Sequence, residues 1–299
     1  MSVAVPPVEK NQRRALVFGI AAVGLWSTVA TAFKIALEYL SPLHLLLFAT
    51  LTSMLVFLGL LTWQGRLLET LKLGRKRWLF YSIQGAINPF TYYWVLFAAY
   101  DQLPAQQAQA INYTWAITMA LLAVPILKQR LTLRELCAML IAYGGVVFIA
   151  TGGQWDFQQT NWVGIGLALL STVLWAGYWL INTRNRDAPI PAMFWCFAFG
   201  TAFLAVAVGL DPTPVPWFEW RAWAAAAYVG MFEMGVTFLL WLTAMRTAEK
   251  TSQLSMLIFL SPFVSLVLIY FLLGEVIEVT TLIGLSLICF GLYLQRKSK

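Results

Sequence analysis

The sequence predicts an all-α membrane protein of ten transmembrane helices, arranged as two five-helix repeats of inverted topology around a central cavity. Three observations predict this fold. The 299 residues are 60% hydrophobic and 11% charged, with a mean hydropathy of +0.73, whereas a soluble domain carries about 25% charged residues. The apolar residues fall into ten runs separated by short polar connections. Finally, the second half of the chain is similar to the first.

The ten apolar runs have the length of membrane-spanning helices, since a helix needs about 20 apolar residues to cross the hydrocarbon core. Helices satisfy their own backbone hydrogen bonds in lipid, which open strands cannot do. The runs lie near residues 15–37, 42–63, 78–99, 105–127, 134–151, 162–182, 191–210, 222–244, 252–273 and 278–295. We therefore expect the lipid bilayer to surround most of the chain, with no cleavable signal peptide because the first run is long enough to stay as a span.

The basic residues predict the orientation of these spans. All but two of the 20 Lys and Arg lie in the terminal tails or in the connections after the second, fourth, sixth and eighth runs. The exceptions are Lys34 and Arg221. Because basic connections stay in the cytoplasm, both termini are expected to be cytoplasmic. The basic residues form short clusters between apolar runs and not one continuous face, which argues against a nucleic-acid partner.

An internal repeat relates the two halves of the chain. A shift of 149 residues aligns Trp26 with Trp175, and a shift of 146 further along aligns Gly145 with Gly291. Each repeat holds five spans, an odd number, so the second copy must enter the membrane in the opposite direction. Inverted repeats are typical of secondary transporters, which hold substrate near the midplane between the halves; duplication of a membrane scaffold is the alternative. The expected units are a cytoplasmic tail (1–14), the first repeat (15–151), the second repeat (162–295) and a second cytoplasmic tail (296–299).

Several motifs resemble a known family over nearly the whole chain. They are "LWST" at 25–28, "WAGY" at 175–178, "FLSPFVSLVLIYFLLGE" at 259–275 and "IGLSLICFGLYL" at 283–294. These motifs resemble the drug/metabolite transporter superfamily of EamA type. Within that superfamily, "INYTWA" at 111–116 together with "LWST" and "WAGY" is most similar to the YddG-type bacterial aromatic amino acid exporters. Those exporters carry Pro where this chain has Ala116, although the repeat-equivalent Pro262 is present.

The resemblance implies a secondary transporter of the bacterial inner (plasma) membrane that exports aromatic amino acids by alternating access, with other neutral amino acids as a wider substrate range. It also implies that spans one, three, four, six, eight and nine surround the central cavity, with spans five and ten at the periphery. An enzyme activity, a cofactor and a metal are not expected from it.

Aromatic and amide side chains deep in the runs are the candidate substrate-binding residues. They offer offset stacking and cation–π surfaces, each contributing on the order of 1 kcal/mol; core packing is the alternative role. These candidates are Trp26, Tyr92, Asn112, Tyr113, Trp115, Trp175 and Tyr178. Trp26 and Trp175 are expected to face each other across the cavity. Tyr113 would point about 100° away from Asn112 on an ideal helix, so all of "NYTW" reaches one cavity only if the helix is distorted.

Glu233 is the further candidate binding residue, because it lies near the centre of the eighth run. A carboxyl group at the membrane midplane is costly and indicates function. It could carry a proton during coupled transport or bind a substrate ammonium group. The alternative is a neutral acid that is hydrogen-bonded between helices.

Lys34 is a basic residue within the first run, about 28 Å along a helix that starts at Ala15. That position is near the outer edge of a hydrocarbon core about 30 Å thick. Its side chain could extend outward or pair with Glu38 at i+4. The alternative is a charge at the outer mouth that guides the substrate carboxylate.

Other functions receive less support from the residues. Efflux of lipophilic cations would also suit an acid in an aromatic cavity. An intramembrane enzyme would need motifs such as His-Glu-x-x-His or Gly-x-Ser-x-Gly, which the chain lacks, and its single His offers little for metal binding. No filter of charged rings is evident for a channel.

Small residues spaced seven apart predict close helix packing, within the monomer or across a homodimer; they are Ala138 and Gly145 in one repeat, Gly284 and Gly291 in the other.

Overall fold

Local sequence signals start several of the helices at the predicted places. The computed structural model describes residues 10–127, 132–153, 160–182, 185, 187–215, 217, 219–249, 257 and 260–296. Helix α1 (Gln12–Leu37) begins after Asn11, whose side chain accepts a hydrogen bond from the Arg14 amide. Helix α2 (Pro42–Trp63) begins after the cap Ser41, with Pro in its first turn. Helix α7 (Leu133–Ala150) begins with a capping box of Thr132 and Glu135.

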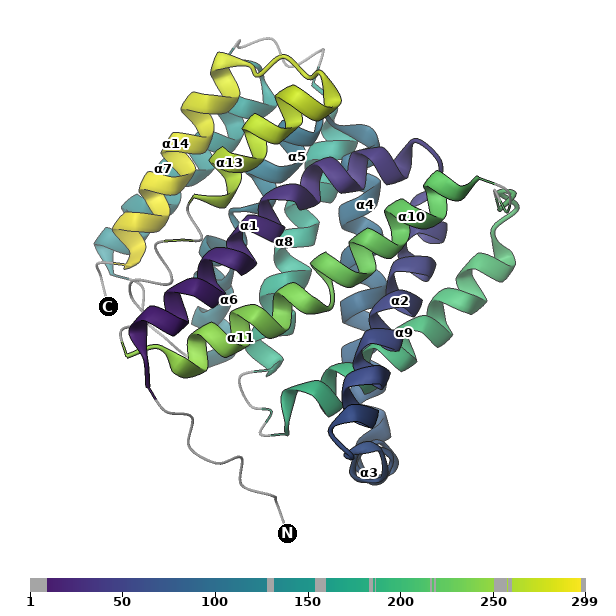
Figure 1. Ribbon diagram of the computed structural model, residues 1–299. Coiled ribbons are helices and arrows are strands. Elements are labelled where there is room, and N and C mark those ends of the chain that lie inside the picture. Colours follow the sequence, from purple (N-terminus) through teal and green to yellow (C-terminus); the bar gives the residue numbers. More distant parts are fainter. Residues whose placement is uncertain are drawn as a thin grey trace.

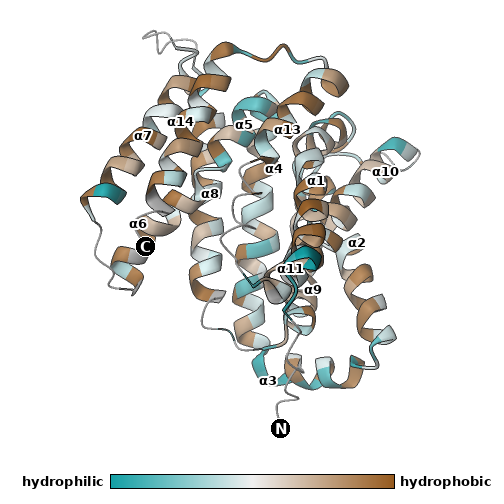
Figure 2. Cartoon of the chain, turned by 60° about the vertical axis from the view of Figure 1, so that its left-hand side comes forward, coloured by the Kyte–Doolittle hydropathy of each residue, from teal (hydrophilic) through white to brown (hydrophobic). Residues whose placement is uncertain are grey.

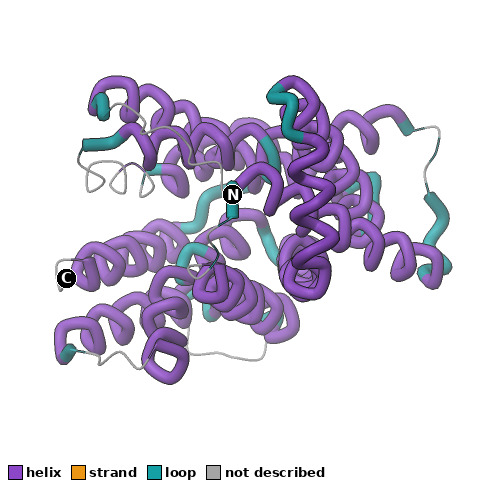
Figure 3. Tube along the Cα trace, turned by 90° about the horizontal axis from the view of Figure 1, so that it is seen from below, coloured by secondary structure: helices purple, strands orange, loops and turns teal. Residues whose placement is uncertain are grey.

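The described residues form helices and short connections, with no strand among them (Figure 3). Seven helical stretches in this part of the chain are long and apolar enough to cross a membrane. They are Gln12–Leu37, Pro42–Trp63, Ala105–Ile126, Leu133–Ala150, Trp162–Ile181, Pro189–Leu210 and Trp220–Met245. Two shorter apolar stretches follow, Ser261–Leu273 and Val279–Leu294. The all-helical class is thereby confirmed for the described residues, and these lengths suit a multi-pass membrane protein, while the count of ten spans stays a prediction.

The surface of the helices is apolar, as a bilayer environment requires. Large side chains such as Leu140, Leu210 and Phe271 are 67%, 81% and 75% exposed. Figure 2 shows hydrophobic residues on the outward faces of most helices. Inside the bundle, hydroxyl groups donate hydrogen bonds to backbone carbonyl oxygens of their own helix. Thr50, for example, donates to the Leu46 carbonyl oxygen at 2.9 Å. Apolar surface therefore faces outward, where lipid and not water is the solvent.

Helix α3 (Leu67–Gly85) corrects the predicted start of the third span near residue 78. Its first part, expected to belong to the connection after the second run, is helical and lies across the lower end of the bundle (Figure 2). The helix kinks at Arg77, which pairs with Asp187. Trp195 of helix α9 (Pro189–Leu210) packs where Gly74 leaves space and donates to the Thr70 carbonyl oxygen at 2.6 Å. The basic connection is thus docked on the second half of the chain.

Several predicted spans are interrupted helices. After α3 come a π-helical segment η1 (Ala86–Thr91) and helix α4 (Tyr92–Gln102). The fourth run forms α5 (Ala105–Asn112) and α6 (Trp115–Leu127), and the eighth forms α10 (Trp220–Tyr228), η2 (Val229–Glu233) and α11 (Val236–Thr247). The described part of the ninth run holds α13 (Ser261–Leu268) and η3 (Ile269–Leu273). The continuous helices of the second half are α8 (Trp162–Asn182), α9 and α14 (Val279–Arg296).

The small residues spaced seven apart join α7 to α14 within the monomer. Figure 1 shows the two helices side by side at one edge of the bundle. A Cβ on Gly145 would lie 2.5 Å from the Gly284 carbonyl oxygen, and one on Gly291 would lie 2.6 Å from the Ala138 carbonyl oxygen. Only residues without larger side chains allow this approach. These four residues therefore pack within the monomer. A homodimer stays a prediction, and it would have to form through other surfaces.

Helix α1 lies at the centre of the arrangement that surrounds the cavity. It contacts α11 and α13 of the second half and α4 and α5 of the first. Across the bundle, α8 contacts α4, α5 and α6. The space enclosed by these helices holds the candidate site.

Candidate functional site

An aromatic cavity lies between α1, α4, the α5–α6 junction, α8 and α11. Its volume is about 170 Å³, more than ten times the roughly 10–15 Å³ that holds one water by the same measure. Seven of the eight predicted substrate-binding residues line it: Trp26, Tyr92, Asn112, Tyr113, Trp115, Trp175 and Glu233. The helices are those expected from spans one, three, four, six and eight. The ninth span cannot be compared fully, since 251–256 and 258–259 lie outside the described residues.

The break in the fourth run brings its polar and aromatic residues to the same cavity. Helix α5 ends at Asn112, a turn follows at Tyr113 and Thr114, and α6 starts at Trp115. The Thr114 hydroxyl donates to the Ile111 carbonyl oxygen at 2.8 Å, which satisfies one backbone group at the break. Asn112, Tyr113 and Trp115 therefore all line the cavity, as they could only on a distorted helix. The distortion forms with Ala116 in place of the proline found in the exporters that the sequence resembles.

A stack of three rings forms one side of the cavity. Trp175 of α8 lies between Tyr92 of α4, with ring centroids 4.6 Å apart, and Tyr178, at 5.7 Å. Tyr178 is only 3% exposed and does not line the cavity, which corrects its predicted place. Because it stacks on the far side of Trp175, its contact with a ligand is through that ring and not direct.

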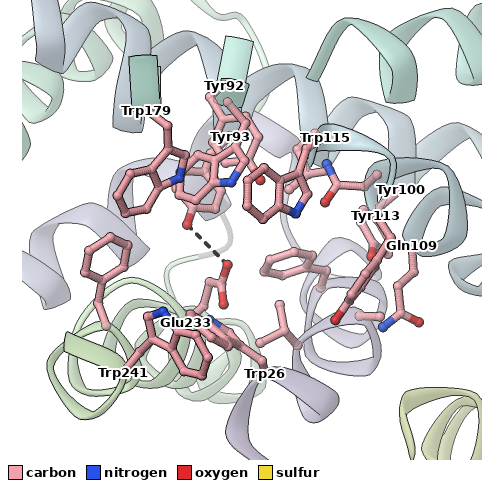
Figure 4. A pocket seen from close by; sticks show the side chains of 17 residues that line it. Trp26, Tyr92, Tyr93, Tyr100, Gln109, Tyr113, Trp115, Trp179, Glu233 and Trp241 are labelled. Atoms are coloured by element: carbon pink, nitrogen blue, oxygen red, sulfur yellow. Dashed lines mark hydrogen bonds between the residues drawn. The ribbon is translucent and has the colours of Figure 1, made fainter. Parts of the chain in front are cut away.

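Glu233 enters the cavity at the end of a π-helical turn. The Met234 amide donates to the Val229 carbonyl oxygen, five residues back, and Gly235 interrupts the helix before α11 begins. The Tyr93 hydroxyl donates to Oε1 of Glu233 at 3.2 Å (Figure 4). Oε2 is shielded from solvent and has no hydrogen-bond partner of normal geometry among the described residues. The helix break thus presents a carboxyl group with an unused acceptor to the interior.

The structure adds aromatic and amide residues that the sequence did not single out. These are Phe33, Tyr93, Tyr100, Gln109, Trp179, Phe238 and Trp241. Some signals were present, because Trp179 lies one helical turn after Trp175 and Gln109 lies three residues before Asn112. Trp241 carried none, since the break at Gly235 separates it from Glu233. Its ring lies 5.5 Å from that of Trp26, beside the Glu233 side chain (Figure 4).

Lys34 does not form the ion pair with Glu38 that its spacing allowed. Its ammonium group donates to the carbonyl oxygens of Tyr100 at 2.8 Å and Leu103 at 3.0 Å, instead of pairing with Glu38. These carbonyls end helix α4, where a positive charge is favourable. Lys34 also lines a second cavity of about 230 Å³, together with Glu38, Asp101 and others. Lys34 thus caps α4 at the end of the bundle where α1 ends, and a role as an outer-mouth charge stays a prediction.

We expect Lys34→Met to lower the melting temperature of the purified protein, because the carbonyls of Tyr100 and Leu103 lose a charged donor. Hydrogen bonds to charged groups contribute about 1.5–3 kcal/mol. Differential scanning fluorimetry in detergent measures the change. Glu38→Gln is the control, since Glu38 is not used by Lys34. A Lys34→Met protein that melts like wild type but no longer exports would instead favour a guide for the substrate carboxylate.

The amino-acid sequence is similar to those of known transporters. The family model described as the EamA-like transporter family matches residues 13–151 and again residues 162–295. An uncharacterized transporter of Clostridium kluyveri is 26% identical over 204 residues, covering 61% of this chain and 64% of the relative. The uncharacterized transporter YyaM of Bacillus subtilis is 25% identical over 230 residues, covering 73% and 72% of the two chains.

Two further similarities concern a named activity and the fold. A probable terminal-alkyne amino-acid exporter of Streptantibioticus cattleyicolor is 26% identical over 200 residues, covering 64% of each chain. A solved structure described as "Crystal structure of protein" matches with a TM-score of 0.67 and 21% identity, covering 97% of this chain and 100% of the other. At that identity the match concerns the fold alone. The first and third relatives named above are each matched over less than two thirds of their length.

Proposed function

Because the chain belongs to the EamA-like transporter family, we propose that it exports aromatic amino acids, and other neutral amino acids, by alternating access through the central cavity. The observation that carries the proposal is the cavity itself, which combines stacked rings with a carboxyl group and amides. The ring of an aromatic substrate can stack on the rings of the cavity. The polar groups of the substrate can form hydrogen bonds with the carboxyl group and the amides. The similarity to an amino-acid exporter supports the same substrate class.

The proposed architecture is ten spans in two inverted repeats, and the helix contacts support it. In such a repeat each contact of one half has an equivalent in the other. The contact of α1 with α11 is matched by that of α8 with α4, and the contact of α1 with α13 by that of α8 with α6. The pairs α2–α9 and α7–α14 join equivalent helices of the two halves. The double match of the family model is consistent with this arrangement.

The proposed location is the bacterial inner membrane, with both termini in the cytoplasm. The distribution of Lys and Arg supports this orientation, because basic connections are retained on the cytoplasmic side. It places the end of α1, and the second cavity beside Lys34, at the outer face. Export would then carry substrate from the central cavity toward that end.

Transport by purified protein in liposomes tests the proposed substrate. We expect counterflow of labelled phenylalanine, with competition by tryptophan and weaker competition by leucine. Liposomes without protein are the control. The same assay with a lipophilic cation such as tetraphenylphosphonium tests the alternative function, broader efflux, because an acid in the cavity would also attract such a cation. Counterflow of the cation without any phenylalanine transport would overturn amino acid export. In cells, expression of the chain should also raise resistance to toxic aromatic amino acid analogues.

A further inference from the structure

Glu233 is the one charged side chain among the described residues that line the central cavity. Its Oε1 accepts a hydrogen bond from Tyr93, and its Oε2 accepts none of normal geometry from the part of the chain that the structure describes. A buried acceptor without a partner is costly, and an unpaired carboxylate more so. A ligand that brings positively charged donors to Oε2 would remove this cost.

The rings around Glu233 suit a cation. Trp26 and Trp241, with ring centroids 5.5 Å apart, lie beside the carboxyl group, while Tyr93 and Trp179 lie across from it (Figure 4). The faces of indole rings attract a cation placed within about 6 Å. An ammonium group at Oε2 therefore finds a negative charge and aromatic faces in the same place.

The other described residues that line the cavity include no positive charge for a carboxylate. The polar groups of the cavity away from Glu233 include the neutral side chains of Gln109 and Tyr113 (Figure 4), and the neutral Asn112 lines the cavity as well. The Asn112 amide already donates to the Ser171 hydroxyl at 3.0 Å. Lys34 of α1 does not provide this charge, because its ammonium group donates to backbone carbonyl oxygens of α4. A carboxylate in this cavity would meet neutral donors, which bind it less strongly than charged ones.

We propose that the cavity recognises its substrate through the ammonium group, held by Glu233, and that the substrate carboxylate is dispensable. The ligand class is then aryl-alkyl ammonium compounds, which includes aromatic amines as well as aromatic amino acids. This inference rests on the proposed export function and names the chemical group that the site selects. It also accounts for the neutral amides at the opposite side, which tolerate substrates with or without a carboxylate.

Three ligands with the same phenyl-alkyl skeleton test the inference on the wild-type protein. Phenylalanine carries both charges, phenethylamine only the ammonium, and 3-phenylpropionate only the carboxylate. Binding is measured by isothermal titration calorimetry in detergent, and transport by counterflow. We expect phenethylamine to bind about as tightly as phenylalanine or more tightly. We expect 3-phenylpropionate to bind at least about 10-fold more weakly, because it has no ammonium group to pair with Glu233.

Variants assign this preference to Glu233. Glu233→Gln keeps the shape and removes the charge, so the affinities for the amine and the acid should converge. Glu233→Asp keeps the charge on a shorter side chain and should preserve part of the preference. Glu69→Gln, which removes an exposed acid paired with Arg66 outside the cavity, is the matched control. If Glu233→Gln does not fold, the three-ligand comparison on the wild type still decides.

The possible results separate this inference from the proposed export. Equal binding of the amine and the acid to wild type, or an unchanged preference in folded Glu233→Gln, overturns recognition through the ammonium. Transport of phenylalanine without binding of phenethylamine overturns it too, while export of amino acids stands. Binding of phenethylamine that depends on Glu233, without any transport of phenylalanine, supports the inference and overturns amino acid export. Failure of phenylalanine and phenethylamine alike to bind overturns both.

Discussion

Gly230→Ala is expected to abolish transport and to lower the melting temperature markedly. A Cβ on Gly230 would overlap the Ala49 carbonyl oxygen and lie 2.7 Å from the Cβ of Thr52, so α2 and η2 must move apart. The Ser53 hydroxyl would lose its hydrogen bond across the contact, to the Gly230 carbonyl oxygen at 2.7 Å, and keep the Ala49 carbonyl oxygen of its own helix at 2.9 Å. Overpacking of this kind costs about 1–3 kcal/mol. The shift would also displace Glu233, three residues along the same segment.

The matched control for this variant is Gly177→Ala on α8. Among the described residues, no atom outside its own helix lies within 4 Å of a Cβ at Gly177, so the added methyl group should be tolerated. Thermal melting in detergent and counterflow of phenylalanine are measured for both proteins. A Gly230→Ala protein with wild-type melting and transport would contradict the close approach of η2 to α2.

Trp175→Ala is expected to weaken binding of aromatic substrates by about 10-fold or more, while weakening binding of leucine much less. Trp175 lines the cavity with its two ring faces against Tyr92 and Tyr178, so its ring edge is left to contact a substrate ring. An edge-to-face or offset aromatic pair contributes about 0.5–1.5 kcal/mol beyond the area that it buries, and loss of the indole also removes apolar contact area. The affinities of phenylalanine and leucine, measured side by side, give the result as a ratio.

Two variants separate stacking from general loss of structure. Trp175→Phe keeps a smaller ring and should retain most of the preference for aromatic substrates. Trp94→Ala removes a tryptophan of α4 that is 40% exposed, stacks on Phe90 and does not line the cavity, so the ratio should not change. Equal loss of affinity for phenylalanine and leucine in Trp175→Ala would show that the ring supports the helices and does not select the substrate.

The two predictions depend on different features of the same site. Gly230 determines where the η2 segment lies against α2, and through it the position of the Glu233 carboxyl group. Trp175 provides an aromatic ring in the wall of the same cavity. Selection of an aromatic ammonium compound requires both a ring and a charge at a suitable separation. We therefore expect the effects of Gly230→Ala and Trp175→Ala to differ in kind, with loss of all binding in the first and loss of ring preference in the second.

Much of the site could be predicted because depth in a membrane span depends on sequence position alone. Trp26, Trp175 and Glu233 lie near the middle of apolar runs, where polar or large aromatic side chains serve packing or function. Tyr178 shows the limit of this reasoning, since it shares a helix face with Trp175 but is covered by it. Spacing along a helix gives the face of a residue, and not which neighbour lies in front of it.

The amino-acid sequence by itself determined the helical class, the approximate spans and the similarity of the two halves. Hydropathy, charge and short caps act over a few residues, so they can be read without knowledge of the neighbours. The tertiary structure alone decided where the helices break, which rings meet Trp26 and Trp175, and that Lys34 caps α4. These features depend on contacts between distant segments, such as Gly230 against Ala49, and such contacts decide which side chains reach the cavity.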